Sequence, residues 1–307
     1  MPTPAVSLNG LTKRYGSRVV VDHLTLELPT GVVAGFVGPN GAGKTTTMAM
    51  LLGLVRPTAG SGTVLGQPLE HPATYLSRVG ALIESPAFYP ALSGERNLRL
   101  FAMVGGHDPD RIPALLELVG LDDRADDPFR AYSLGMKQRL GIAAAMLGDP
   151  RLLILDEPSN GLDPQGMREM RELIARVAAD GRTVVVSSHV LSELEQVCDW
   201  LIMIDHGAVL YVGAAEDFAA DSDTSLTIAT ARPDDLPALR TVFSAAGHAV
   251  ELRDHQLVAR VGPDDLDAVA GELNRMAFDA GIVLTELSRQ RTTLQDRYLS
   301  LVDGSAR

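Results

Sequence analysis

The residues best suited to chemistry form a glycine-rich loop directly after the apolar run Val32–Val37. The spacing G-x-x-x-x-G-K-T is filled by Gly38, Gly43, Lys44 and Thr45. In such a loop glycines let backbone N–H groups turn toward phosphate groups, the lysine reaches the β and γ oxygens, and the threonine hydroxyl can bind Mg²⁺. The loop therefore predicts a nucleotide site whose binding segment also includes Pro39, Asn40, Gly41, Ala42 and Thr46.

A carboxylate pair follows the apolar, strand-like run Leu152–Leu155. Asp156 can hold a metal ion, usually through water, and Glu157 can polarise a water molecule for attack on a phosphate. Taken alone, such a pair could equally be an acidic turn at the end of a strand. Downstream of a phosphate loop, the pair instead indicates a Mg²⁺-nucleotide site that hydrolyses its ligand.

The elements that must position these residues alternate between strands and helices. The helix expected at Thr45–Leu54 would direct the positive end of its dipole toward the phosphates. Leu152–Leu155 and Thr183–Val186 are continuous apolar strands, and a helix is expected between them at Met167–Ala179. Buried strands that alternate with helices indicate a mostly parallel sheet covered on both faces, which places the chain in the α/β class. Further strands are expected at Val19–Val21 and Leu24–Leu28.

A change of composition divides the chain into two domains. Residues 1–214 are expected to form the nucleotide-binding domain, and its helical subdomain at about 85–150 includes helices at Leu98–Val104, Pro113–Val119 and Met136–Leu147. A linker rich in alanine and aspartate is expected at 215–224. Residues 225–307 follow the order βαββαβ and end with a short helix near Thr293–Val302. This order predicts a small accessory α+β domain of the ferredoxin-like kind.

Composition and charge disfavour several classes of protein. The 307 residues are 46% hydrophobic, enough for one large core or two moderate ones. A formal net charge of −12 disfavours nucleic-acid binding. The single cysteine, Cys198, excludes an intramolecular disulfide and is expected to be a buried apolar side chain in a reducing compartment. No secretion signal is recognisable, and no apolar run approaches the ~18–20 residues that span a bilayer.

Five segments in a fixed order give the chain a resemblance to the nucleotide-binding subunits of ATP-binding cassette (ABC) transporters. They are the phosphate loop, Tyr132–Arg139, Asp156–Glu157, Ser159–Pro164 and His189. The resemblance covers roughly residues 6–214 and implies a P-loop NTPase core, ATP as substrate, Mg²⁺ as cofactor and hydrolysis coupled to transport. It also implies a homodimer of ATPase subunits that is cytoplasmic and attached to the inner face of the membrane through a transmembrane permease.

The resemblance assigns roles to residues outside the phosphate loop. Tyr15 matches the aromatic residue that stacks on adenine, although a tyrosine at the edge of a sheet is an equally simple interpretation. Ser133 and Gly135 match the signature segment that contacts the γ-phosphate held by the other subunit, and Asp163 matches the loop that links the two sites. His189 matches the histidine that contacts the γ-phosphate and holds water and Glu157 in place.

Two departures from the family pattern concern the signature and Glu84. Leu134 stands where the family has glycine and Met136 where it has glutamine, which leaves the geometry of the contact between subunits open. Glu84 replaces the glutamine that meets the metal ion and the permease in most cassette ATPases. This glutamate, the signature and the stretch Pro86–Pro90 are similar to those of bacitracin, lantibiotic and daunorubicin-resistance exporters. A conservative exchange of one polar residue for another is the alternative interpretation.

These features lead to the hypothesis that the chain is the ATPase subunit of an exporter for antibiotics, peptides or drugs. The C-terminal domain would then steady the dimer or the permease. The alternative is a soluble cassette ATPase that acts on ribosomes or nucleic acids, but such proteins usually carry two cassettes or a long coiled-coil insert, and neither pattern occurs here. A domain that only senses ATP is disfavoured by the intact Glu157 and His189. The transported substrate, the direction of transport, the permease and the effect of the two departures on turnover stay open.

Overall fold

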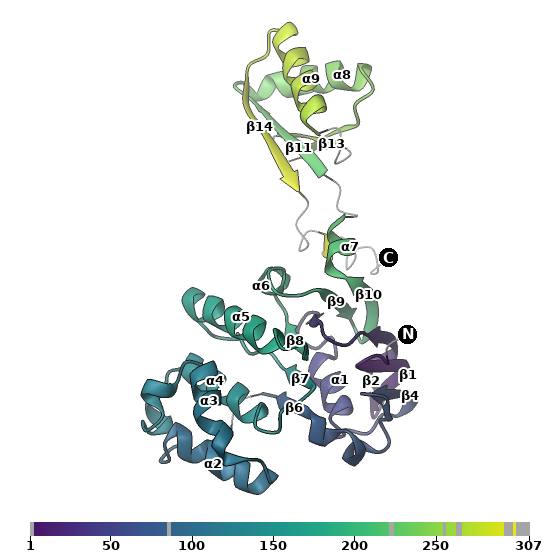
Figure 1. The fold of residues 1–307 in the computed structure, drawn as a ribbon. Coiled ribbons are helices and arrows are strands. Elements are labelled where there is room, and N and C mark those ends of the chain that lie inside the picture. The colour runs from purple at the N-terminus through teal and green to yellow at the C-terminus, as the bar shows by residue number, and fades with distance from the viewer. Residues whose placement is uncertain are drawn as a thin grey trace. The chain divides into compact units, whose positions relative to one another are not determined.

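The computed structural model describes residues 3–84, 87–220, 224–253, 256–261, 266–291 and 297–298 (Figure 1). The chain forms two compact units, Met1–Glu216 and Asp217–Arg307. In the described residues no helix is long and apolar enough to cross a membrane. Each unit has its own hydrophobic core, and the two are described separately.

A six-stranded sheet forms the centre of the first unit, with the strand order β10-β9-β3-β8-β7-β6. Its strands are parallel except for β10, which pairs antiparallel with β9. The strands are β3 (Val33–Val37), β6 (Val79–Leu82), β7 (Leu152–Leu155), β8 (Thr183–Ser188), β9 (Trp200–Asp205) and β10 (Ala208–Ala214). Because β3, β7 and β8 are buried along their whole length, the prediction of continuous apolar strands in a covered parallel sheet is confirmed.

A second, antiparallel sheet covers the start of the chain, with the order β2-β1-β4-β5. Its strands are β1 (Val6–Tyr15), β2 (Arg18–Leu28), β4 (Ala59–Val64) and β5 (Gln67–Pro68). The two strands expected at Val19–Val21 and Leu24–Leu28 are one strand, because β2 stays paired with β1 on both sides of His23, where φ is 48° and the register shifts. Apolar residues of this sheet share a core with helix α1 (Lys44–Leu51) and with strands of the central sheet.

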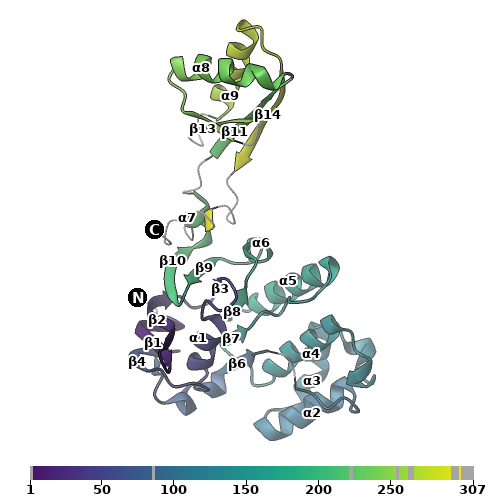
Figure 2. The same ribbon diagram turned by 180° about the vertical axis from the view of Figure 1, so that it is seen from behind.

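The helical subdomain is inserted between β6 and β7. Its helices are α2 (Gly94–Gly105), α3 (Ile112–Leu118) and α4 (Leu134–Ala145), and both views show them grouped on the side of the central sheet away from β1, β2 and β4 (Figures 1 and 2). The helices α5 (Pro164–Ala178) and α6 (Leu191–Leu194) follow β7 and β8. Short 3-10 turns lie at Pro72–Thr74, Leu76–Arg78, Pro109–Arg111, Asp122–Arg124 and Phe129–Ala131.

The second unit has a four-stranded antiparallel sheet with the order β12-β13-β11-β14. The elements are β11 (Thr224–Thr230), a 3-10 turn at Pro233–Asp235, α8 (Leu236–Ala245), β12 (Val250–Arg253), β13 (Gln256–Val261), α9 (Leu266–Asp279) and β14 (Leu284–Arg291). Both long helices pack on the sheet around Phe243, Leu273 and Ile228, so the expected ferredoxin-like order is confirmed. Within the expected linker, Ala215–Ala220 forms helix α7. The helix expected near Thr293–Val302 lies largely outside the described residues.

Candidate nucleotide site

The site lies where β3, β7 and β8 end on the same edge of the central sheet. The glycine-rich loop leaves β3 and enters α1, the carboxylate pair follows β7, and His189 follows β8. Since parallel strands place their carboxyl ends together, three segments that are distant in sequence meet there. A cavity of about 380 Å³ lies beside the loop, and His189 is not among its lining residues, which are Arg18, Val20, Asn40, Gly41, Gly43, Lys44, Thr45, Thr46, Glu157 and Asn160.

The helix that follows the loop presents an open amino end to this cavity. Helix α1 has Gly43 as its N-cap, no side-chain cap and no acidic residue in its first turn. Helices α4 and α5, by contrast, are capped by the side chains of Ser133 and Asp163. The first N–H groups of a helix have no intrahelical acceptor, and they attract anions together with the helix dipole. An anion such as a phosphate therefore suits the amino end of α1.

Two glycines of the loop are required by close backbone contacts. A Cβ atom on Gly43 would lie 2.7 Å from the carbonyl oxygen of Val20, and the φ angle of Gly43 is 103°. A Cβ atom on Gly38 would lie 2.5 Å from the carbonyl oxygen of Ile204. The loop is also held from the β9–β10 turn, where the Gly207 N–H donates to the Ala42 carbonyl at 3.0 Å. Strand β2 and this turn thus fix the loop's path.

Lys44 extends back along the loop and is almost completely buried. Its Nζ atom donates to the carbonyl oxygens of Gly38 at 2.7 Å and Pro39 at 3.3 Å. The same atom lies 3.2 Å from Oε1 of Glu157. A buried ammonium group needs such partners, and in this arrangement Glu157 supplies the compensating charge that a phosphate could supply instead.

Asp156 is held by two hydroxyl groups. Thr45 Oγ1 donates to Asp156 Oδ2 at 2.7 Å, and Ser187 Oγ donates to Asp156 Oδ1 at 2.6 Å. Ser187 Oγ also accepts from the Glu157 N–H at 2.8 Å, so it connects both members of the carboxylate pair. Ser187 was not among the predicted site residues. The available signal was its position near the end of β8, on the strand that leads to His189.

The two carboxylate oxygens of Glu157 contact different side chains, an ammonium group and an imidazole ring. Oε1 faces Lys44, whereas Oε2 lies 2.7 Å from Nδ1 of His189. The backbone of Glu157 has a φ of 48°, which is uncommon for a residue with a side chain. Strained conformations of this kind concentrate at functional sites. The side chain is one-fifth exposed, so solvent water has access to a carboxylate that is already oriented by its neighbours.

The donor set for a metal ion fits Mg²⁺ bound together with a phosphate. The Thr45 hydroxyl and the Asp156 carboxylate lie side by side, joined by a hydrogen bond of 2.7 Å, and both are oxygen donors of the kind that Mg²⁺ prefers. Among the described residues no group of three or more His, Cys, Asp or Glu side chains could hold a metal. A site with few protein ligands is typical of Mg²⁺ that arrives with a nucleotide.

Several residues expected at the site do not line this cavity. Ser133 lies at the start of α4, and a Cβ atom on Gly135 would lie 3.6 Å from Leu162, so the signature segment contacts the loop that ends at Asp163. Asp163 Oδ1 accepts from the Gly166 N–H at 2.8 Å and caps α5. Ser133, Gly135 and Asp163 therefore lie together on a surface next to the cavity, and none of them lines the cavity of its own subunit.

Tyr15 and Glu84 also lie outside the cavity. The Tyr15 ring is half exposed, with Lys13 Nζ 4.8 Å from the ring centroid, and Tyr15 pairs with the cavity residue Arg18 across the β1–β2 turn. Glu84 is exposed and has a φ of 58°. It lies two residues after Leu82, whose carbonyl accepts from the Asp156 N–H at 2.8 Å.

Three cavity residues were missing from the predicted site, namely Arg18, Val20 and Asn160. Arg18 and Val20 belong to β2, which is far from the loop in sequence and carries no motif. Asn160 lies inside the segment Ser159–Pro164, so its position in a recognised motif was the available signal. Arg18 adds a positive charge beside the phosphate loop, which suits a polyphosphate ligand.

Comparisons with known proteins agree with this geometry. Residues 21–160 match the family model described as ABC transporter. The bacitracin transport ATP-binding protein BcrA of Bacillus licheniformis is 37% identical over 97% of both chains. The lantibiotic transport ATP-binding protein SrtF of Streptococcus pyogenes is 40% identical over 67% of this chain and 89% of its own. A solved ATP-binding subunit of an ABC transporter is 32% identical, with a TM-score of 0.62 over 70% of this chain and 92% of its own.

Proposed function

The chain belongs to the ABC transporter family as an ATP-binding subunit that couples ATP hydrolysis to transport, and on that premise we propose how its residues carry out the reaction. We infer that it works as a homodimer with bound Mg²⁺ and drives an export permease. The observation that carries the proposal is the connected set of contacts between Lys44, Glu157 and His189 beside the pair Thr45 and Asp156.

Binding of ATP would exchange one partner of Lys44 for another. The β- and γ-phosphates take the place of the Glu157 carboxylate at Nζ, and the open amino end of α1 receives the phosphate oxygens. Thr45 and Asp156 would hold Mg²⁺, which would supply positive charge to offset the charge on the transferred phosphoryl group. The Tyr15 ring is assigned to the adenine base, since its exposed ring near Arg18 is available for stacking.

Hydrolysis would then depend on the freed oxygen of Glu157. Once Oε1 leaves Lys44, it accepts a hydrogen bond from the attacking water and orients it in line with the γ-phosphate. His189 keeps its contact with Oε2 and so fixes the direction of the carboxylate. The Ser187 hydroxyl holds the backbone of Glu157 and the side chain of Asp156 at the same time.

The second half of each site is assigned to a partner copy of this chain. Ser133 and Gly135 do not line the cavity of their own subunit, although a hydroxyl and a glycine at a helix start suit an anion. Ser133 Oγ accepts from the Met136 N–H at 3.3 Å, which leaves its O–H free to donate to a γ-phosphate. Asp163, beside this segment, would link the two sites. ATP favours the closed dimer because only that state adds these contacts.

The permease is assigned to an apolar pocket of the helical subdomain near Glu84. This pocket has a volume of about 420 Å³ and is lined by Ala87, Phe88, Tyr89, Leu100, Phe101 and Val104. Exposed apolar surface of this kind is typical of a docking site, and attachment there would hold the chain at the inner face of the membrane. Because the relatives BcrA and SrtF are named for bacitracin and lantibiotic transport, we propose an antibiotic peptide as the exported cargo.

Substitution of Glu157 by glutamine tests the reaction mechanism. Glu157→Gln keeps the shape of the side chain but removes the charge that orients water, so ATP binding should persist while kcat falls by at least about 100-fold. The variant should also accumulate as an ATP-bound dimer in size-exclusion chromatography. Lys44→Ala is the control, because it should lose ATP binding and fail to dimerise. Turnover at the wild-type rate in Glu157→Gln would disprove the role of Glu157.

A further inference from the structure

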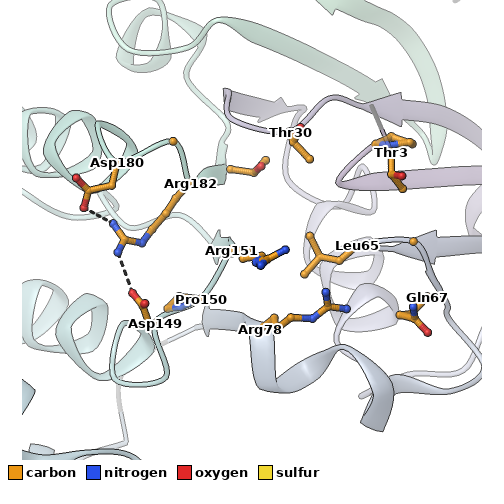
Figure 3. A pocket seen from close by; sticks show the side chains of 14 residues that line it. Thr3, Thr30, Leu65, Gln67, Arg78, Asp149, Pro150, Arg151, Asp180 and Arg182 are labelled. Carbon is orange, nitrogen blue, oxygen red and sulfur yellow. Dashed lines mark hydrogen bonds and ion pairs between the residues drawn. The ribbon is translucent and has the colours of Figure 1, made fainter. Parts of the chain in front are cut away.

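A second and larger pocket lies at the amino ends of the central parallel strands, whereas the nucleotide loop lies at their carboxyl ends. It has a volume of about 780 Å³ and lies where the parallel strands begin, next to Arg78 before β6, Arg151 before β7 and Thr183 at the start of β8 (Figure 3). The mechanism proposed above uses none of these residues. Three arginines, Arg78, Arg151 and Arg182, line the pocket together with two aspartates, Asp149 and Asp180, so the pocket carries a net positive charge although the chain as a whole is acidic.

The backbone places Arg78 and Arg151 next to each other. The Arg151 N–H donates to the Arg78 carbonyl at 2.9 Å, and the Thr183 N–H donates to the Arg151 carbonyl at 3.0 Å. The two arginines directly precede the paired residues Val79 and Leu152 of adjacent parallel strands. Neighbouring strands are roughly 4.8 Å apart, and like charges side by side on a sheet are unfavourable. A negative ligand between them would remove this repulsion.

Only the third arginine of the pocket has acidic partners in the part of the chain that the structure describes. Arg182 pairs with Asp180 at 2.6 Å and with Asp149 at 2.9 Å (Figure 3). Asp149 also pairs with Arg111, which lies outside the pocket, at 3.0 Å. The hydrogen bond from Arg182 lowers the pKa of Asp149, which therefore stays ionised. The guanidinium groups of Arg78 and Arg151 have neither a hydrogen bond nor an ion pair among the described residues, so their two charges are uncompensated.

We propose that this pocket binds a soluble phosphate monoester, with the phosphate group held between Arg78 and Arg151. A phosphate monoester carries a charge of about −1.5 to −2 at pH 7, which matches two guanidinium groups better than a single carboxylate does. Arginine also binds phosphate through two parallel N–H donors. The pocket is much larger than a phosphate ion, so the rest of the ligand contacts Thr30, Gln67 and Leu65.

Calorimetric titration of the full chain with inorganic phosphate at pH 7.5 tests the proposal. Part of the heat can come from the nucleotide loop, so the informative quantity is the difference between wild type and the double variant Arg78→Gln/Arg151→Gln. The double variant should lose one binding equivalent, or show a Kd about tenfold higher, while its MgATPase activity stays unchanged. The matched control is Arg168→Gln, because Arg168 is an exposed arginine of α5 outside the pocket.

Further measurements give the proposal clear ways to fail. In a Lys44→Ala background the phosphate loop is impaired, yet the arginine-dependent binding should persist. The single variant Arg151→Gln repeats the test if the double variant folds poorly, since the Arg151 side chain is exposed. Superimposable isotherms for wild type and these arginine variants would overturn the proposal. Binding to vesicles of phosphatidic acid and phosphatidylcholine without any response to soluble phosphate would overturn the assignment to a soluble ligand.

Discussion

The hydroxyl group of Ser187 joins the two carboxylate residues of the nucleotide site. It donates to Asp156 and accepts from the backbone N–H of Glu157, and the residue is 1% exposed. Asp156 would hold the metal ion and Glu157 would orient the water, so their relative position decides whether the water lies in line with the phosphate. Ser187 is therefore a positioning residue whose effect is transmitted through its neighbours.

Removal of this hydroxyl should lower turnover more than substrate affinity. Ser187→Ala leaves Glu157 N–H and one oxygen of Asp156 without a partner, a loss of about 1–3 kcal/mol that corresponds to roughly 5- to 150-fold in kcat. ATPase kinetics should show a much smaller change in KM. Ser187→Thr should restore most of the rate, because it keeps the hydroxyl.

Ser188→Ala is the matched control for this prediction. In the wild-type protein the hydroxyl of Ser188, the residue after Ser187, accepts a hydrogen bond from the Val190 N–H at 2.9 Å. An equal loss of kcat in both alanine variants would show that the end of β8 only needs general packing. In that case the contact between Ser187 and the carboxylate pair would have no special role.

Cys198 should be chemically inert in the native protein. Burial, followed by the nearby Asp199 charge, raises the pKa of its thiol to about 12 from an ordinary 9.0, so the native thiol stays protonated near neutral pH. At pH 8 the native protein should react with Ellman's reagent at least about 100-fold more slowly than the chain in guanidinium chloride. Because the folded pKa is the higher one, stability from this proton is complete below pH 9 and falls as the pH rises toward 12. Rapid native modification would contradict the burial of this side chain.

At the scale of elements, the conformation of the phosphate loop depends on strand β2 and on the β9–β10 turn. Gly43 contacts the Val20 carbonyl of β2, and Ala42 is held by Gly207 of the β9–β10 turn. The loop's conformation is therefore set by segments that carry none of its own residues. This explains why its glycines differ in importance even though they belong to one motif.

Alanine substitutions at Gly43 and Gly41 distinguish a clash with β2 from the backbone strain that any alanine has at positive φ. In Gly43→Ala the new Cβ would lie 2.7 Å from the Val20 oxygen, whereas in Gly41→Ala nothing lies within 4 Å. Both positions have positive φ, so each substitution should cost about 1–2 kcal/mol in strain. Only Gly43→Ala should also lose most ATP affinity, by at least about tenfold. Chemical denaturation and nucleotide titration measure these effects, and equal affinities would contradict the role of β2.

Most individual helices and strands could be predicted from the sequence, but which distant segments meet at the site could not. The strand Leu152–Leu155 was predicted correctly because a short apolar run next to a carboxylate pair leaves few alternatives. The single strand β2 was not predicted, because the polar residues Asp22 and His23 separate its two apolar runs, whereas pairing with β1 continues across them with a shift in register. Arg18 and Ser187 were missed because each reaches the site through folding of a separate segment, and neither spacing nor residue type marks such a position.

At the scale of the whole molecule, the two units have independent cores. Phe243, Leu273 and Ile228 belong to the C-terminal core, whereas the nucleotide site is built entirely from residues of Met1–Glu216. A compact unit with its own core can fold without its neighbour. The catalytic unit should therefore be separable from the accessory one.

Truncation after Glu216 tests this separation. The shortened protein should fold and hydrolyse ATP within about threefold of the wild-type rate, because no residue of the site is lost. Calorimetry of the full chain should show two unfolding transitions, and the truncated chain should show one. If the C-terminal unit steadies the complex, co-purification with the permease should decrease while ATPase activity remains. An aggregated or inactive truncated chain would show that the units depend on each other.

The ion pair between Lys44 and Glu157 has a further consequence for nucleotide binding. The cation that should bind phosphate and the carboxylate that should activate water neutralise each other at 3.2 Å. The free energy needed to separate Lys44 from Glu157 lowers the affinity for ATP. It also means that Glu157 becomes available to water only when a polyphosphate has replaced it at Lys44. The subunit therefore binds ATP somewhat more weakly, but its steps occur in a fixed order. Glu157 is released to orient water only after the nucleotide has bound.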